Sequence, residues 1–358
     1  MKKRSLMCLI LALSLLVCAC AAPVEEGEER DSNYLYVYNY GTYIDPDVID
    51  MFEEETGLTV VYDVFDTNEE MYPVISSGSV KYDVVCASEY TVEKLWKNGY
   101  LSEINLDNVP NFKYVNDICR QFAEQFDPGN KYSVPYNWGT VGILYNSRMI
   151  EEGEITKWSD LWKEEYFDEI MMMDSLRDIY VAPLCMLGYS INTTSEAEMR
   201  EATDLLIKQK ELVYSYKTDA IRDFLLNESA AIGQIYSGEA LYCQEDDEDM
   251  VYVVPEEGSN IWFDCWVIPK NAQSQKNAEL WIDFMLRPEI GFMTYEYVGY
   301  STPNSATEEM IKEEYPEEID NQALFPDQEL VDNCEIFHFL GADVDRMYNN
   351  FWKELKAY

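Results

Sequence analysis

The chain has 358 residues, with 26 Lys and Arg against 68 Asp and Glu, and a formal net charge of −42. Such an acidic surface repels nucleic acid and anionic lipid headgroups and attracts cations, so we expect no nucleic-acid partner. The length is sufficient for two lobes, each with its own core. None of the nine cysteines forms a C-x-x-C pair, which disfavours a zinc site and favours buried thiols over a disulfide framework.

The N-terminus has the features of an exported protein. A basic start precedes the apolar run 6–17, which is too short to cross a membrane, and Cys20 stands where a bacterial lipobox has its acylated cysteine. We therefore expect a signal peptide over 1–19 and a lipidated tether over 20–33. The alternative is ordinary cleavage near Ala22. The mature protein would lie on the outer face of the cytoplasmic membrane, or in the periplasm where there are two membranes, held by lipid alone.

Strand-like and helix-like segments alternate in the first third of the chain. The expected strands are 34–38, 58–65 and 81–87, and the expected helices are 47–57, 68–76 and 91–99. This order predicts a parallel or mixed sheet with helices on both faces. Ligands of such sheets collect at the carboxyl ends of the strands, where N39-Y-G-T-Y and S88-E-Y fall.

The rest of the chain continues the α/β pattern without an internal repeat. Further strand-like or helix-like text lies at 141–146, 158–162, 170–173, about 176–187, 230–239, 278–298 and about 344–355. The acidic cluster 245–249 is typical of a solvated loop; a calcium site there lacks the spacing that an EF-hand requires.

The stretch 261–269 is nearly all apolar and is typical of a buried strand, yet Asp264 lies in its middle. Because side chains alternate along a strand, Trp262, Asp264 and Trp266 share one face. A carboxylate among indoles is costly to ionise without a positive partner. The strand holds no basic residue before Lys270, so we predict that a positively charged ligand pairs with Asp264.

Catalysis is less well supported than binding. The only histidine, His338, lies in an apolar stretch, and the chain lacks the common hydrolase and phosphate-binding motifs, so we expect neither an enzyme nor a cofactor. One alternative is an exported glycoside hydrolase with Asp178 and Asp264 as its carboxylate pair. The role of Asp178 stays open, because Ser175 and Asp178 also have the spacing of a helix N-terminal capping box.

Several segments spread over the chain resemble one protein family. They are N39-Y-G-T-Y-I, N68-E-E-M-Y, Y82-D-V-V with S88-E-Y, F126-D-P-G-N-K-Y-S-V-P-Y-N-W-G-T, L187-G-Y-S-I-N-T-T, W262-F-D, L286-R-P-E and G299-Y-S-T-P-N. Together they resemble the spermidine/putrescine-binding proteins of ABC importers. The likeness extends from about Tyr34 to the last helix.

The resemblance implies a two-lobe, class II periplasmic-binding-protein fold. Each lobe would be a mixed sheet flanked by helices, with the ligand cleft between the lobes. Lobe 1 would comprise 34–138 and 266–305, and lobe 2 would comprise 139–265 and 306–358. The resemblance also implies a polyamine as ligand, the permease of an ABC importer as partner, and a monomer.

In that family, aromatic side chains sandwich the methylenes of the polyamine and acids hold its amines. The contact residues implied here are Tyr40, Tyr43, Ser88, Tyr90, Asp178, Tyr236, Trp262, Asp264 and Tyr300. Tyr40 and Tyr236 stand where the spermidine binder has tryptophans, and Asp178 replaces a glutamate.

Three further positions depart from the family pattern. Thr42 and Ser175 occupy places where that relative has acids, and Phe337 replaces a glutamine. Fewer acids neutralise fewer ammonium groups, so we hypothesise that putrescine is favoured over spermidine. Another small cation or ferric ion is the alternative cargo for the same fold, although Trp262 argues against a metal.

Overall fold

The computed structural model describes residues 33–218 and 220–358. The expected signal peptide, Cys20 and nearly all of the expected tether therefore lie outside the described residues. Internal contacts hold Asn33–Tyr358 together as one unit.

The described residues form a nine-stranded mixed sheet in the order β2-β1-β3-β9-β4-β7-β5-β6, with β8 paired to β4. The strands are β1 (Tyr34–Tyr40), β2 (Thr59–Phe65), β3 (Val84–Ser88), β4 (Ser133–Asn146), β5 (Ile170–Met173), β6 (Val213–Lys217), β7 (Ile232–Tyr236), β8 (Met250–Val253) and β9 (Ile261–Val267). β1 pairs in parallel with β2 and β3, whereas β9 is antiparallel to both of its neighbours, β3 and β4. The expected mixed sheet is confirmed.

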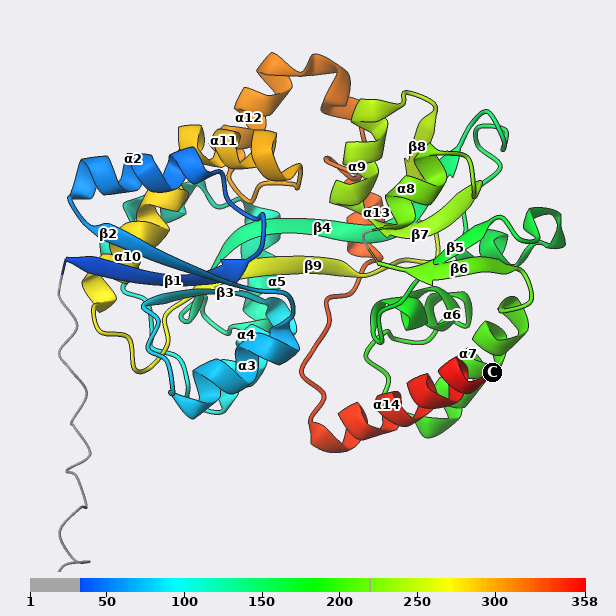
Figure 1. Cartoon of the computed structure of the whole chain (residues 1–358), viewed down its shortest axis with the longest axis horizontal. Coiled ribbons are helices and arrows are strands. Elements are labelled where there is room, and N and C mark those ends of the chain that lie inside the picture. Colours follow the sequence, from blue (N-terminus) through cyan, green and yellow to red (C-terminus); the bar gives the residue numbers. More distant parts are fainter. Residues whose placement is uncertain (1–32, 219) are drawn as a thin grey trace, which may run out of the picture. The chain divides into compact units, whose positions relative to one another are not determined.

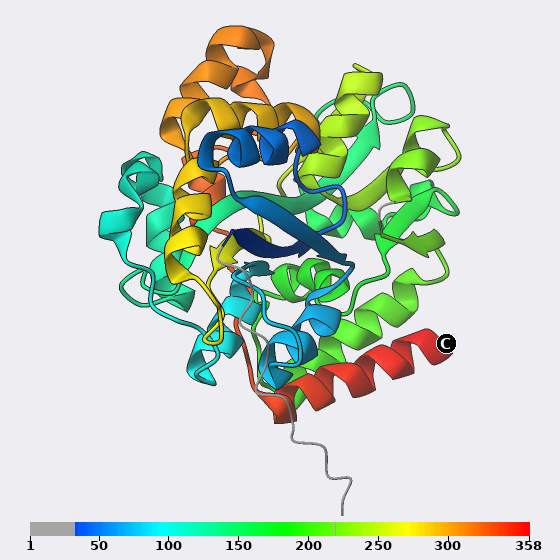
Figure 2. The same ribbon diagram turned by 60° about the vertical axis from the view of Figure 1, so that its left-hand side comes forward.

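Helices cover both faces of this sheet (Figure 1). They are α2 (Pro46–Thr56), α3 (Asn68–Ser77), α4 (Glu89–Lys97), α5 (Asp117–Phe126), α6 (Val181–Met186), α7 (Glu196–Gln209), α8 (Ile221–Leu226), α9 (Ser237–Asp246), α10 (Gln275–Met285), α11 (Pro288–Val298), α12 (Ser305–Glu314), α13 (Gln328–Asp332) and α14 (Ala342–Ala357). Figure 2 turns β1 and β2 toward the viewer and shows them between two helix layers.

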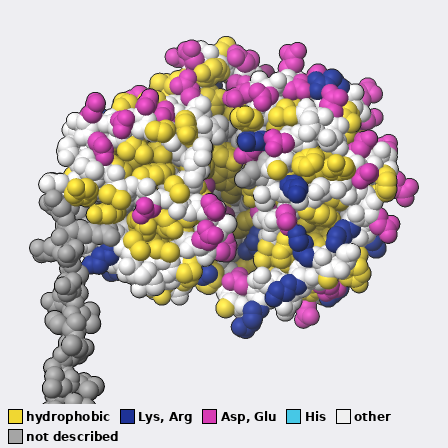
Figure 3. Space-filling view, in the orientation of Figure 1, with side chains coloured by type: hydrophobic (Ala, Val, Ile, Leu, Met, Phe, Trp, Pro, Cys, Tyr) yellow, Lys and Arg dark blue, Asp and Glu magenta, His cyan; other side chains and the backbone are white. Residues whose placement is uncertain are grey.

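Two long strands join the halves of the sheet. β4 pairs with β9 over Ser133–Thr140 and then with β7 from Val141 onward, so it changes neighbours halfway along its length. In Figure 1, β4 and β9 extend from β1–β3 with their helices toward β5–β7 with theirs. The halves of the sheet are thus connected by backbone that belongs to both, and the space-filling view shows a furrow between them (Figure 3).

The structure corrects two expected helices. The expected helix 278–298 is two helices, α10 and α11, because Pro288 occupies the first turn of the second one and lacks the N–H that would continue the first. The expected helix 176–187 is shorter, a 3₁₀ turn over Asp178–Tyr180 followed by α6.

The acidic cluster 245–249 is tied to one arginine. Asp247 and Asp249 form ion pairs with Arg148 at 2.6 and 2.5 Å, and Glu228 adds a third pair at 3.0 Å. The expected solvated loop is confirmed only in part: residues 247–249 connect α9 to β8, whereas Glu245 and Asp246 are the last two residues of α9. All six cysteines among the described residues are free, and five of them are buried.

Candidate functional site

The predicted site residues gather where strands end and helices begin. Tyr40 is the last residue of β1, Ser88 ends β3 and precedes α4, and Tyr236 ends β7 and precedes α9. Trp262 and Asp264 lie on β9, opposite the end of β3, because Ser88 pairs with Asp264 in the antiparallel register. The carboxyl ends of parallel strands meet at one edge of a sheet, so residues far apart in sequence are brought together here.

Asp264 is 7% exposed and is held by hydroxyl groups. The Ser88 hydroxyl donates to Oδ1 at 2.7 Å and the Tyr43 hydroxyl donates to Oδ2 at 2.8 Å. Burial raises the pKa of Asp264, and the hydroxyls of Ser88, Tyr43 and Tyr40 oppose that rise. Among the described residues, no Lys, Arg or His forms an ion pair with Asp264. The carboxylate therefore has neutral donors on both oxygens and, in the part of the chain that the structure describes, no ion-pair partner.

Asn68, which opens α3, orients this group and was not predicted as a site residue. Its Oδ1 accepts the Ser88 backbone N–H at 3.3 Å and its Nδ2 donates to the Ser88 hydroxyl oxygen at 2.9 Å. Because the Ser88 oxygen is already an acceptor, the single hydroxyl proton is free to point at Asp264. The Tyr40 hydroxyl oxygen lies 2.9 Å from the same Ser88 oxygen. The N68-E-E-M-Y segment was the only sequence signal for Asn68.

A second buried carboxylate, Asp178, opens the 3₁₀ turn that follows β5 and is 6% exposed. It accepts a hydrogen bond from the Ser175 hydroxyl. The 3₁₀ turn over Asp178–Tyr180 has Arg177 at its N-cap position and no side-chain cap hydrogen bond, so the capping-box alternative is wrong. Burial raises the pKa of Asp178, and the Ser175 and Tyr236 hydroxyls and the charge of Arg177 lower it. Asp178 thus differs from Asp264, since a guanidinium group already acts on its charge.

Arg177 itself contacts two aromatic rings and an amide. It stacks over the Phe337 ring at 4.3 Å and over the Tyr348 ring at 5.1 Å. It also donates to Asn192 Oδ1 at 3.0 Å. Phe337, which the sequence suggested as a site residue, is buried beneath this guanidinium.

An aromatic wall connects the two carboxylates. The ring of Trp262 packs edge to face against Tyr300 and Tyr236, with ring centroids 5.0 and 6.2 Å apart. The ring centroids of Tyr300 and Tyr43 lie 6.0 Å apart. Two of these rings pack directly against the backbone of a glycine. A Cβ at Gly139 would lie 2.6 Å from the Trp262 ring, and a Cβ at Gly238 would lie 2.0 Å from the Tyr300 ring. The wall therefore depends on the absence of a side chain at both glycines.

Tyr90 and Thr42 lie at the margin of the site. Tyr90 is half-buried and donates to Glu69 at 3.4 Å. Burial raises the pKa of Tyr90, and the charges of Glu69, Glu89 and Asp178 raise it further. Thr42 is exposed and has a left-handed backbone conformation with φ 54°.

The arrangement offers an anionic and aromatic surface. Two buried carboxylates supply negative charge, tyrosine and tryptophan rings lie between them, and acidic side chains are prominent over both halves of the molecule (Figure 3). Carboxylates pair with ammonium groups, and ring faces attract cations and cover methylenes. Within the described residues, no cluster of three or more His, Cys, Asp or Glu side chains has the arrangement of a metal site. The fold and the site together define a solute-binding protein.

Comparison with known proteins supports this classification. The model of the family described as bacterial extracellular solute-binding protein matches residues 47–325. The spermidine/putrescine-binding periplasmic protein of Escherichia coli is 33% identical over 328 residues, which cover 91% of this chain and 92% of that protein. The putrescine-binding periplasmic protein SpuD of Pseudomonas aeruginosa is 29% identical, with 91% and 93% covered.

Solved structures agree. The spermidine/putrescine ABC transporter substrate-binding protein PotD of Streptococcus pneumoniae has 37% identity and a TM-score of 0.82, over 91% of this chain and 99% of that one. A spermidine/putrescine ABC transporter structure from Listeria monocytogenes has 36% identity and the same TM-score, over 91% and 100%. The chain therefore belongs to the bacterial extracellular solute-binding proteins and, within them, to the spermidine/putrescine-binding group.

The comparisons confirm the expected α/β periplasmic-binding-protein fold. The names of these relatives describe solute binding and transport, which favours the binding interpretation over the hydrolase alternative. No helix in the described part of the chain has the length and apolar character needed to span a membrane.

Proposed function

We propose that the protein captures a polyamine outside the cytoplasm and delivers it to the permease of an ABC importer. The observation that carries this proposal is Asp264, a buried carboxylate whose two oxygens accept hydrogen bonds from the hydroxyls of Ser88 and Tyr43 and which has no ion-pair partner among the described residues. An ionised carboxylate accepts about four hydrogen bonds. Acceptor capacity therefore remains for the N–H groups of a primary ammonium, which would also supply the missing positive charge.

The expected affinity follows from three kinds of contact. A charge-assisted hydrogen bond from an ammonium to Asp264 contributes about 1.5–3 kcal/mol, and a comparable one to Asp178 contributes at the other end. Each ring that faces a desolvated ammonium adds about 0.5–2 kcal/mol. The sum, less the cost of ordering the ligand, is compatible with a Kd on the order of micromolar, or about −8 kcal/mol.

Within this class we propose that putrescine is favoured over spermidine. Ser175 is already engaged as a donor to Asp178, Thr42 is an exposed hydroxyl, and Phe337 lies beneath Arg177. None of these three side chains adds a negative charge for a further ammonium group. The two ammonium groups of putrescine would each have one buried acid, Asp264 or Asp178, whereas the middle amine of spermidine would lack an acid of its own.

We further propose that the ligand closes two lobes with the boundaries given above, hinged on β4, β9 and the chain after Asn304. A change in the radius of gyration measured by X-ray scattering with and without putrescine tests closure.

Lipidation at Cys20 would keep the receptor at the membrane, and Cys20→Ala should release it into the medium. A variant that stays in the membrane fraction contradicts the anchor.

Thermal denaturation and calorimetric titration test the central proposal. A ligand present at about 100 times its Kd stabilises the folded state by about 2.7 kcal/mol, so millimolar putrescine should raise the melting temperature, whereas glucose and ferric ion should not. Clearly tighter binding of spermidine would end the putrescine preference alone. A protein that binds neither polyamine would refute the proposed function.

A further inference from the structure

The loop after β1 carries Tyr43 and begins with an unfavourable backbone conformation. Thr42 has φ 54°, in the left-handed region that a β-branched residue rarely occupies. The next side chain, Tyr43, is buried, and its hydroxyl donates to Asp264 at 2.8 Å. A strained loop persists only where surrounding contacts hold it in place, so the loop requires an anchor.

Tyr136 on β4 supplies that anchor. Its hydroxyl donates to the backbone carbonyl oxygen of Tyr43 at 2.6 Å, in a buried environment, and the two rings meet edge to face at 5.6 Å. Tyr43 therefore takes part in two separate hydrogen bonds: its backbone carbonyl accepts from Tyr136, and its side-chain hydroxyl donates to Asp264.

A β-bulge explains how Tyr136 comes to face the loop. In the register of β4 with β9, Pro135 pairs with Cys265 and Asn137 pairs with Asp264, so Tyr136 is the extra residue between two consecutive partners. Bulges redirect a side chain and are enriched next to functional sites. Here the redirected residue stands directly beside the strand position of Asp264.

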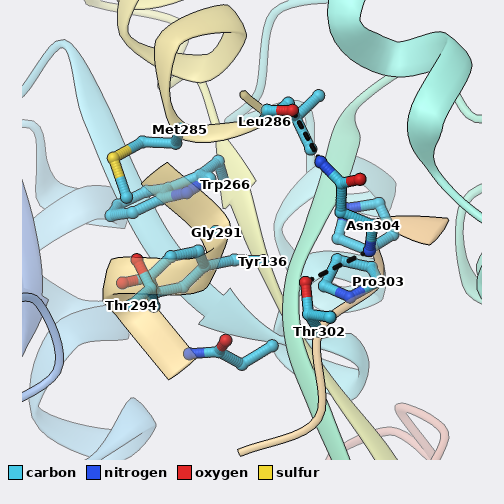
Figure 4. A pocket seen from close by; sticks show the side chains of 11 residues that line it. Tyr136, Trp266, Met285, Leu286, Gly291, Thr294, Thr302, Pro303 and Asn304 are labelled. Carbon is cyan, nitrogen blue, oxygen red and sulfur yellow. Dashed lines mark hydrogen bonds between the residues drawn. The ribbon is translucent and has the colours of Figure 1, made fainter. Parts of the chain in front are cut away.

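The environment of the ring restricts its movement. Tyr136 packs against Trp266 at 4.6 Å, and Trp266 packs against Trp281 at 5.9 Å. Figure 4 shows the Tyr136 ring beside the Trp266 indole and near Thr294. The cavity at this place has room for only about 10 Å³, close to the smallest space that holds one water. The tight packing around the ring therefore restricts the position of the Tyr136 hydroxyl.

We propose that Tyr136 is a positioning residue of the ligand site: its hydroxyl holds the loop of residues 41–45 so that Tyr43 presents its own hydroxyl to Asp264. The inference rests on the proposed binding of a polyamine at Asp264. Without the Tyr136 hydroxyl, the loop would relax at Thr42 and the Tyr43 hydroxyl would no longer orient the carboxylate for the incoming ammonium group.

A double-mutant cycle measured by calorimetric titration with putrescine tests this role. Tyr136→Phe keeps the ring and should weaken binding about 3- to 10-fold, which is the worth of a net hydrogen bond. In a Tyr43→Phe background the same change should alter the Kd by less than about twofold. Tyr348→Phe is the matched control, since that buried hydroxyl also donates to a backbone carbonyl, of Thr193 at 3.0 Å, and should leave the Kd unchanged.

An unchanged Kd in Tyr136→Phe, or an equal loss in both backgrounds, overturns the positioning role. If Tyr136→Phe does not unfold cooperatively, crystal structures of the wild type with and without putrescine test the positioning role instead. A distance above about 3.5 Å between the Tyr136 hydroxyl and the Tyr43 carbonyl oxygen in the complex overturns that role. A wild type that binds no diamine refutes the proposed function instead. Structures of the free wild type and Tyr136→Phe then test positioning, and an unmoved Tyr43 in the variant contradicts it.

Discussion

Replacing Asp264 by asparagine should abolish useful polyamine binding while leaving the fold intact. Asparagine keeps the shape of the side chain and removes its charge. Its amide nitrogen cannot accept the hydroxyl proton that Ser88 or Tyr43 now donates to the second carboxylate oxygen. An ammonium group in the cleft would then be desolvated without an anion.

The magnitude follows from the burial of this position. Breaking a buried ion pair by removing one partner costs about 3–5 kcal/mol. At about 1.4 kcal/mol for each tenfold change, the Kd should rise between about 150-fold and a few thousand-fold. The unliganded protein should lose little stability, because burial already disfavours the Asp264 charge and one lost hydroxyl acceptor costs only about 1 kcal/mol.

Asp160→Asn is the matched control. Asp160 is as buried as Asp264, at 8% against 7% exposure, but it accepts two backbone N–H bonds at 2.9 Å and pairs with Lys163 at 3.1 Å. Asp160→Asn should lower the melting temperature and leave the Kd unchanged, whereas Asp264→Asn should raise the Kd and change the melting temperature little. Calorimetric titration with putrescine and thermal denaturation measure both quantities. An Asp264→Asn variant that binds putrescine like the wild type would refute the reasoning.

Three further outcomes are expected. Burial raises the pKa values of Asp264 and Asp178 above 3.8, so affinity for putrescine should fall as the pH falls through those raised values. The same protonation should make the unliganded protein more stable as the pH falls, because the folded state binds these protons more tightly than the unfolded chain. Titrations at several pH values check this, and an affinity that increases on acidification contradicts it. Burial raises the pKa of Glu89, which is 1% exposed and accepts the Phe263 N–H, to about 8. The unfolded chain loses this proton near pH 4.5 and the folded protein only near pH 8, so stability should fall as the pH rises between those values. Glu89→Gln should remove that loss, visible as a flatter dependence of the melting temperature on pH; identical profiles for the two proteins would show that Glu89 does not titrate there. Trp262→Ala should weaken putrescine binding about 10- to 100-fold through lost ring contact, whereas equal affinity in a titration would remove Trp262 from the ligand wall.

The strand that carries Asp264 could be predicted from the sequence because alternation along a strand is a local property. The apolar text of 261–269 and the single acid within it sufficed to place Asp264 beside Trp262 on one face. The absence of a counter-ion followed from the lack of basic residues in that strand. The structure agrees, since no ion pair to Asp264 forms within the described residues.

Contacts between distant elements could not be predicted in the same way. Asn68 orients Ser88 across the gap between α3 and β3, and Tyr136 reaches Tyr43 only because β4 carries a bulge. A bulge leaves no periodic signal in the sequence, and Pro135 within β4 makes that segment resemble a loop. The Ser175–Asp178 spacing was ambiguous because a capping box and a direct side-chain hydrogen bond use the same two residue types.

A crystal structure of the protein with putrescine tests the central claim most directly. We expect a ligand nitrogen at about 2.7–3.2 Å from the Asp264 carboxylate, with the Ser88 and Tyr43 hydroxyls still donating to its two oxygens. A ligand whose nitrogen atoms both lie elsewhere, or a lysine or arginine of the protein paired with Asp264 in the complex, would contradict it.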